Sequence, residues 1–350
     1  MSQKDKKKKT LYSTENFETA GGKKKKKKGG KVKMDWKFLA ITIPLTVLFI
    51  IAVWMWRLPA NYAHMFIGHY EGTTDALEEF KMFDHTDEET DALVPLQEDY
   101  DNWKQQNLGY PMTIKGANNA TLSAYYYDQG SNVTVVMLHS FDESKDGDEL
   151  LAPYFWSKGY NIFIPDLRDH GDSGGGQVTW GLNESKDLVA ELDAITQTYG
   201  DQQFILYGNL LGAGSELMAM EDLPDSVDFI IAEDAYPSLT SLAKCFCKNL
   251  VHVPAWAGVP LLNSGAKRAE DFSIKSVDVA DSVTDKIPVL LVYGSDDQIL
   301  SDDAEQEMED AFNGNAEVLT ISGGRYETNY AMGKDQYEQK IDEYISKYVK

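Results

Sequence analysis

The sequence predicts an α/β fold in which a mostly parallel sheet carries helices on both faces. The first observation is a series of short apolar runs, typical of buried strands, at 112–115, 121–127, 133–138, 160–165, 204–207, 229–232, 289–293 and 318–321. The second is a set of helical patterns between and after them, at 146–158, 184–199, 211–220 and 334–348. Apolar strands that alternate with amphipathic helices indicate a parallel sheet buried on both sides.

Two segments depart from this alternation. Residues 58–110 form an acidic linker, and its last part, around Trp103, predicts an accessory helix. The folded domain then covers residues 111–350. Within it, residues 236–286 interrupt the succession of strand and helix, and we interpret them as a helical cap inserted above the sheet.

The N-terminal region predicts a membrane anchor. Residues 1–35 are rich in lysine and cannot bury a core, so we expect a disordered tail. Residues 38–56 then run for 19 positions without a charge, which is enough to cross a bilayer, and tryptophans flank the stretch. We therefore predict a transmembrane helix at 36–57. A cleaved signal peptide is the alternative, but the stretch is long for one and residues 58–63 offer no clear cleavage site.

Charge is divided unevenly along the chain, whose formal net charge is −23 at pH 7. Residues 1–37 hold 14 of the 33 Lys and Arg but only 4 of the 56 Asp and Glu. The positive-inside rule therefore places the tail in the cytoplasm and residues 58–350 outside the cell, in a single-pass cell-membrane protein. The lysines would also contact anionic lipid of the bilayer. The acidic body excludes nucleic acid as a partner.

The most informative motif lies at 203–217, which reads as a buried strand, a glycine turn and a helix. Gly208 and Gly212 bracket Asn209, Leu210 and Leu211 in this turn. Further motifs accompany it in the chain: Leu-His-Ser-Phe at 138–141, Pro-Asp-Leu-Arg-Asp-His-Gly-Asp-Ser-Gly-Gly at 165–175, Thr-Trp-Gly at 179–181, Glu-Asp-Phe-Ser-Ile at 270–274 and Tyr-Gly-Ser-Asp-Asp at 293–297.

These motifs, in this order, resemble those of the membrane-anchored α/β-hydrolases of Gram-positive bacteria, a serine-esterase-like branch of the superfamily. The resemblance covers about residues 98–350 and the anchor. It implies the α/β-hydrolase fold, with a mostly parallel sheet of the eight-stranded type, helices on both faces and a cap at 236–286.

The resemblance also implies a Ser–acid–His triad, and two of its three positions are substituted. The nucleophile of the Gly-x-Ser-x-Gly motif falls on Leu210, which has no nucleophilic atom. The acid position falls on Asp297 and is retained. The histidine position falls on Tyr326, and no histidine follows Asp297 in the sequence. An unperturbed tyrosine titrates near pH 10 and is a poor base at neutral pH.

The oxyanion hole that the resemblance implies would use backbone N–H groups of Leu211 and of the turn at Ser140 and Phe141. Ser140 stands where the family has a glycine that keeps this turn open. Two neighbours, His139 and Asn209, are candidate ligand-pocket residues, although a purely structural role is the competing interpretation for His139.

Other motifs carry no chemistry in this interpretation. Ser173 lies in a Gly-x-Ser-x-Gly pattern, but within a loop and outside the strand–turn–helix context of a nucleophile. Cys245 and Cys247 are too few for a zinc site, and the acidic run at 84–91 lacks the calcium-loop pattern. We therefore predict no metal and no cofactor.

We expect a cell-surface protein whose domain is inactive as a serine hydrolase and acts as a binding or scaffolding module. Its ligand site would lie beneath the cap, floored by Leu210 and flanked by Asp297 and Tyr326, and would suit a small apolar or acyl ligand. One alternative is a cell-surface carboxylic ester or amide hydrolase with a non-standard catalytic set. Another is an anchored structural protein that binds nothing.

Overall fold

A computed structural model describes residues 41–49, 85–250, 252–301 and 303–349 of the chain. The chain divides into two units, residues 1–51 and 52–350, which are considered separately. In the first unit, residues 41–49 form a helix whose apolar side chains are largely exposed. The predicted tail at 1–35 lies outside the described residues.

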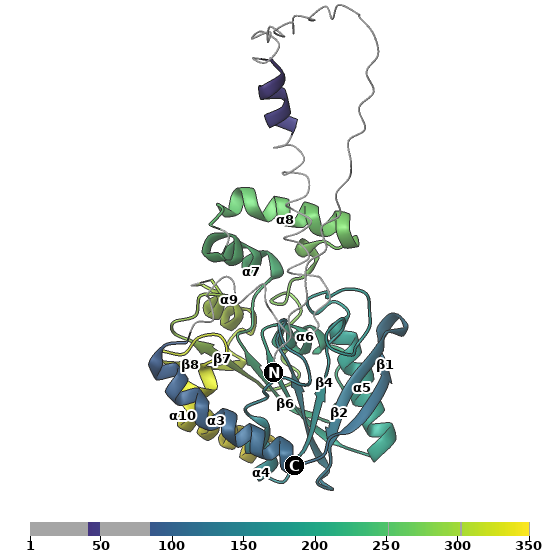
Figure 1. Cartoon of the computed structure of the whole chain (residues 1–350). Coiled ribbons are helices and arrows are strands. Elements are labelled where there is room, and N and C mark those ends of the chain that lie inside the picture. The colour runs from purple at the N-terminus through teal and green to yellow at the C-terminus, as the bar shows by residue number, and fades with distance from the viewer. Residues whose placement is uncertain (1–40, 50–84, 251, 302, 350) are drawn as a thin grey trace, which may run out of the picture. The chain divides into compact units, whose positions relative to one another are not determined.

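The second unit is built around one eight-stranded sheet with the order β1-β2-β4-β3-β5-β6-β7-β8 (Figure 1). Strands β3 to β8 run parallel, and each pairs with its neighbours in this order. Strand β1 pairs antiparallel with β2, and β2 pairs antiparallel with β4. The bounds of β1 to β8 are Tyr110–Lys115, Thr121–Tyr127, Val133–Leu138, Asn161–Pro165, Gln203–Asn209, Val227–Glu233, Val289–Gly294 and Ala316–Ile321. The mostly parallel sheet predicted from the sequence is confirmed.

Helices cover both faces of this sheet, because successive side chains of a strand point to opposite sides. Val136 and Leu138 of β3 join one apolar core, and Val135 and Met137 join the other. The first core receives α5 (Glu184–Tyr199), α6 (Leu211–Ala219), α7 (Leu239–Cys245), α8 (Ala255–Glu270) and α9 (Ala304–Ala311). The second receives α3 (Asp87–Gln106), α4 (Ala152–Ser157) and α10 (Asn329–Tyr348) (Figure 1).

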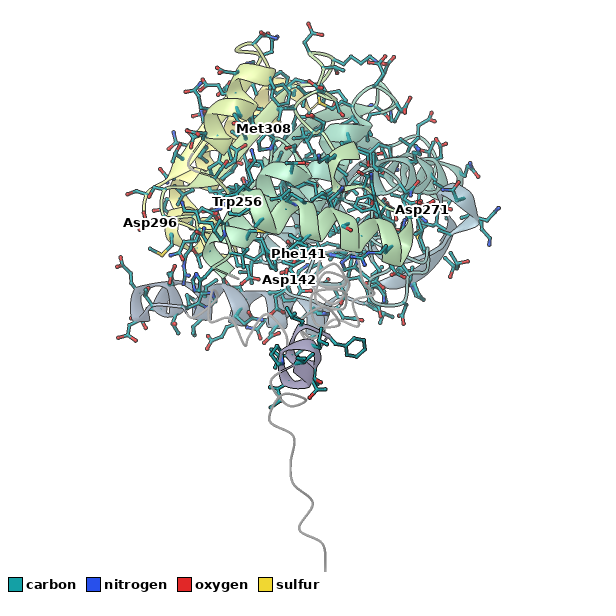
Figure 2. All side chains as sticks on the ribbon, turned by 90° about the horizontal axis from the view of Figure 1, so that it is seen from above. Phe141, Asp142, Trp256, Asp271, Asp296 and Met308 are labelled. Atoms are coloured by element: carbon teal, nitrogen blue, oxygen red, sulfur yellow. The ribbon has the colours of Figure 1, made fainter. Side chains whose placement is uncertain are left out.

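The segment interpreted as a cap contains α7, a π-helix at Phe246–Leu250, α8 and a short 3₁₀ helix at Ile274–Ser276. Seen from above, α8 lies nearest the viewer and covers the top of the domain (Figure 2). Trp256 on this helix is exposed to solvent. A second 3₁₀ helix, at Ala117–Asn119, joins β1 to β2.

The predicted transmembrane helix at 36–57 falls mostly on residues outside the described part of the chain. Among the helices that the structure does describe, none combines the length and the apolar character needed to span a bilayer. Of the predicted anchor, the structure describes only residues 41–49, which are helical.

Candidate functional site

The turn between β5 and α6 keeps the backbone of a nucleophile elbow. Leu210 stands at its apex with φ 43° and ψ −93°, a conformation that is strained for any residue other than glycine. Its N–H donates a hydrogen bond to the carbonyl oxygen of Glu233 on β6 (2.9 Å). The strand therefore passes straight into the helix through a sharp turn, as the motif predicted.

The two glycines of the elbow are required by close backbone contacts. A Cβ atom on Gly208 would lie 2.4 Å from the carbonyl carbon of Gly212. A Cβ atom on Gly212 would lie 2.1 Å from the carbonyl oxygen of Leu138 at the end of β3. Neither position accepts a side chain, so the packing of β3, β5 and α6 fixes the shape of the turn.

The side chain of Leu210 is completely buried, with 0% of its surface exposed, and it belongs to the apolar core. The leucine therefore closes the place where a serine hydroxyl would be exposed. It lines neither of the two cavities described below. The structure thus does not show Leu210 as the floor of an open pocket; it places this residue inside the core.

Asp297, the retained acid, lies in the loop after β7 and binds three backbone N–H groups. One carboxylate oxygen accepts hydrogen bonds from Ile299 and Leu300, both at 2.7 Å. The other accepts from the N–H of Tyr326 at 2.8 Å. Burial raises the pKa of Asp297, and the backbone donors oppose that shift. This carboxylate therefore holds two loops together.

Tyr326, in the histidine position, directs its hydroxyl away from Asp297 and toward the turn after β3. The hydroxyl is hydrogen-bonded to Ser140 Oγ (2.7 Å) and to the carboxylate of Asp142. Only 4% of the residue is exposed. Burial raises the pKa of Tyr326 well above 10, and the carboxylate of Asp142 raises it further. The phenol therefore stays protonated at neutral pH and is a poor base there.

In the turn after β3, which was expected to supply an oxyanion donor, the N–H of Ser140 already has an acceptor. The N–H of Ser140 donates a hydrogen bond to Oε2 of Glu143 (3.1 Å). Phe141 packs against Trp180, with ring centroids 5.5 Å apart. An oxyanion formed at this turn would meet the carboxylates of Asp142 and Glu143, which disfavours negative charge there.

His139 is a structural histidine that also reaches a cavity. Its Nε2 accepts a hydrogen bond from the N–H of Leu167 (2.9 Å), so its neutral ring carries the proton on Nδ1 and donates to the carbonyl of Ser140 (2.6 Å). Burial lowers the pKa of His139 well below 6.5, and the nearby His170 adds to this effect. Both ring nitrogens are committed to hold the loops at the carboxyl edge of the sheet.

Ser173, in the second Gly-x-Ser-x-Gly pattern, also has a structural role. Its hydroxyl donates to the carbonyl of Asp166 (2.7 Å) and accepts from the N–H of Ser123 (2.8 Å). The residue is buried in the loop that follows β4.

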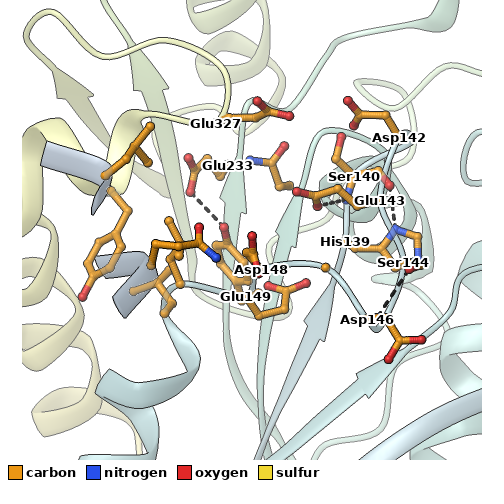
Figure 3. Close-up of a pocket in the computed structure, with 18 of the residues that line it drawn as sticks. His139, Ser140, Asp142, Glu143, Ser144, Asp146, Asp148, Glu149, Glu233 and Glu327 are labelled. Atoms are coloured by element: carbon orange, nitrogen blue, oxygen red, sulfur yellow. Dashed lines mark hydrogen bonds between the residues drawn. The ribbon is translucent and has the colours of Figure 1, made fainter. Parts of the chain in front are cut away.

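Two cavities lie near the carboxyl edge of the sheet. The first, of about 580 Å³, lies between α3 and the loop 139–151 and reaches His139, Asn209, Glu233 and Glu327 (Figure 3). The second, of about 670 Å³, lies between the cap and the loop after β7, where Asp297 lines it. Both candidate pocket residues named from the sequence, His139 and Asn209, therefore line the first cavity.

The first cavity gathers acidic residues that the sequence interpretation overlooked: Asp142, Glu143, Asp146, Asp148, Glu149, Glu233 and Glu327. Their positions carried a usable signal, because Asp142 and Glu143 follow β3, Glu233 ends β6 and Glu327 follows β8. The carboxyl ends of parallel strands share one edge of a sheet, where open α/β sheets bind ligands. Within the described residues, no group of three or more His, Cys, Asp or Glu side chains is arranged to hold a metal ion.

Comparisons with known proteins agree with this architecture. A family model described as the alpha/beta hydrolase fold matches residues 133–258. The uncharacterized protein YqkD of Bacillus subtilis (strain 168) is 23% identical over 235 residues, covering 64% of this chain and 77% of that protein. The esterase Pf2001 of Pyrococcus furiosus superposes with a TM-score of 0.59 at 19% identity, over 70% of this chain and 93% of that one. Est1E of Butyrivibrio proteoclasticus, solved with ferulic acid, gives a TM-score of 0.51 at 16% identity, over 68% and 99%.

Proposed function

From the premise that this chain has the α/β-hydrolase fold, we propose that it does not hydrolyse esters by a serine mechanism and instead acts as a membrane-anchored binding or scaffolding module. The observation that carries the proposal is Leu210 at the apex of a preserved nucleophile elbow. A hydrocarbon side chain cannot attack a carbonyl carbon, and no rearrangement of neighbouring loops supplies it with an oxygen.

The surroundings of the elbow support the same conclusion. Tyr326 replaces the base, and burial keeps its hydroxyl protonated. Within the described residues, Asp297 is bound to backbone N–H groups and to no imidazole. The N–H of Ser140 is paired with Glu143. The nucleophile and the base are therefore replaced, and the acid and one of the two expected oxyanion donors form structural hydrogen bonds.

The module is proposed to bind a small apolar or acyl ligand in the cavity between the cap and the loop after β7. Val253, Pro254 and Leu300 supply apolar lining there. Lys244 and Lys248 line the same cavity and would pair with a carboxylate head group. The proposed setting is the cell membrane, with the anchor at 36–57 in the bilayer, the tail at 1–35 in the cytoplasm and the domain outside.

A reversion experiment tests the loss of activity. The full chain and the double variant Leu210→Ser with Tyr326→His are compared against short-chain nitrophenyl esters and a fluorophosphonate probe. We expect no turnover and no labelling of the natural protein. Activity gained by the double variant would show that its elbow frame is intact. Turnover by the natural protein that disappears in Leu210→Ala would overturn the proposal.

A second candidate function is a cell-surface esterase or amidase with a non-standard catalytic set. The fold shared with the Pyrococcus furiosus and Butyrivibrio proteoclasticus esterases favours it, at the level of fold alone. In this case the natural protein would react with the fluorophosphonate, and peptide mapping would identify one modified serine. Labelling confined to unfolded protein would argue against it.

A further inference from the structure

The cavity between α3 and the loop 139–151 is separate from the proposed acyl site and has a different chemical character. It lies at the carboxyl ends of β3, β5 and β6, where open α/β sheets place their ligands (Figure 3). Its volume of about 580 Å³ falls in the range of small-molecule sites.

Seven carboxyl side chains line this cavity, and none of the described residues that line it is Lys or Arg, although Lys145 pairs with Asp146. Burial raises the pKa of five of these carboxyls, and it lowers the pKa of His139; the five are Asp142, Glu143, Glu149, Glu233 and Glu327. The lining therefore disfavours anions, and a bound cation would stabilise the ionised form of these carboxyl groups.

Two acceptors that line this cavity have no hydrogen-bond donor in the described part of the protein. Glu149 is only 7% exposed, and its carboxylate receives none of the side-chain hydrogen bonds that the described residues form. Oδ1 of Asn209 is buried and also unpartnered. By contrast, Glu233 accepts hydrogen bonds from Tyr207 and Tyr337. A buried acceptor without a donor, such as Oδ1 of Asn209, carries a free-energy cost that a donating ligand would remove.

The arrangement favours an extended organic cation over a single metal ion. The described carboxylates do not converge in a group that could hold a metal. The same cavity is also lined by apolar side chains of Leu93, Val94, Leu150 and Leu151. A chain that joins ammonium groups by methylene segments suits this mixed lining, because the ammonium groups can pair with carboxylates while the methylene segments contact the apolar side chains.

We propose that this cavity binds a linear aliphatic polyamine, with its ammonium groups donating to Glu149, Asn209 and the surrounding carboxylates. The methylene segments contact the leucines and Val94. This binding requires no hydrolytic chemistry and does not depend on occupancy of the cap cavity.

The test measures spermidine binding to the full chain in detergent micelles by isothermal titration calorimetry. We expect saturable binding that Glu149→Gln weakens roughly tenfold or more, since a hydrogen bond to a charged group contributes about 1.5–3 kcal/mol. The control Glu307→Gln removes an exposed carboxylate on α9, outside the cavity, and should bind as the natural protein does.

A second variant keeps the test informative if Glu149→Gln fails to fold. Val94 lines the cavity and is 49% exposed, so Val94→Trp fills the cavity from its rim without changing charge. We expect it to abolish spermidine binding, whereas Leu108→Trp, at a position 81% exposed and outside the cavity, should not.

Three results would overturn the proposal. The first is the absence of saturable spermidine binding. The second is equal weakening by Glu149→Gln and Glu307→Gln, which would indicate attraction to the acidic surface as a whole. The third is displacement of spermidine by calcium chloride together with calcium binding that depends on Glu149, which would assign the cavity to a metal ion.

Discussion

At the scale of single residues, Leu210 shows that the backbone of a nucleophile elbow can be kept around a side chain that is not nucleophilic. Its positive φ costs about 1–3 kcal/mol, and burial of a leucine side chain contributes about 1.5–3 kcal/mol in the opposite direction. Gly208 and Gly212 leave no room for a relaxed turn. The elbow is thus retained by packing, and its geometry alone is no measure of activity.

Glu327 offers a prediction on pH and stability. Burial and, to a smaller extent, the nearby Asp142 raise its pKa to about 8, against the opposing effect of Arg325. The folded state therefore binds a proton that the unfolded state has released above its own pKa, so stability falls as pH rises through the folded pKa. Between pH 7 and 9 we expect this group to reduce the free energy of unfolding by about 1 kcal/mol.

Thermal unfolding in detergent micelles at pH 7, 8 and 9 checks this effect. Glu327→Gln should reduce the fall in melting temperature, because the amide does not titrate. Glu307→Gln, on the exposed surface of α9, serves as the control. An identical fall in the natural protein and in Glu327→Gln would contradict the assignment.

At the scale of elements, α3 is attached to the domain by an ion pair as well as by its apolar face. Arg325 Nε lies 2.5 Å from Glu89 Oε1, and its Nη2 donates to Oε2 at 2.8 Å. The hydrogen bond from Arg325 is the main reason that the pKa of Glu89 falls to about 2. The same carboxylate accepts from the N–H of Thr86 and so completes the helix cap.

We predict that Arg325→Ala loosens α3 selectively, because it leaves a buried carboxylate without its partner at a cost of roughly 3 kcal/mol. Hydrogen exchange should accelerate in Asp87–Gln106 and remain unchanged in α5. The exposed pair of Lys286 with Glu221 gives the control, since Lys286→Ala should leave exchange in α3 unaltered. Uniform acceleration over both helices would show a global loss of stability instead.

The strands and the elbow were predictable from the sequence, whereas the interior of the site was not. Apolar period and glycine spacing are local signals, and they located β3 to β8 and the turn at Leu210. The predicted helix at 146–158 begins only at Ala152, because Lys145 binds Asp166 through both its N–H and its ammonium group and holds the preceding residues in turns. Contacts between residues far apart in the sequence do not show in the periodicity of apolar residues.

The same limit applies to the candidate site. Tyr326 meets Ser140 across 186 positions of sequence, and the acidic cavity collects side chains from the loops after β3 and β8 and from the end of β6. Residue types at strand ends indicate which groups share the carboxyl edge of the sheet. Their pairing depends on how the loops fold, which only the structure displays.

At the scale of the whole molecule, charge asymmetry is the feature that a membrane anchor would use. Positive charge is concentrated in residues 1–37, whereas the remaining 313 residues carry 19 basic against 52 acidic side chains. The positive-inside rule follows the distribution of Lys and Arg near an apolar segment, and acidic residues contribute little to it. The lysine run at 23–28 should therefore set the orientation of the proposed anchor.

We predict that the folded domain is digested by protease added outside intact cells and that the tail is protected. Replacing the six lysines at 23–28 by glutamine should invert part of the population, so that a fraction of the domain becomes protected. The same replacement at three exposed domain lysines far along the sequence from the apolar segment, Lys186, Lys267 and Lys275, should leave the orientation unchanged. Mass spectrometry of the purified chain distinguishes an uncleaved anchor from a cleaved signal peptide, because cleavage would leave a protein that lacks residues 1–57. A full-length chain recovered entirely without membrane would contradict both forms of targeting and leave the apolar stretch at 38–56 without a bilayer role.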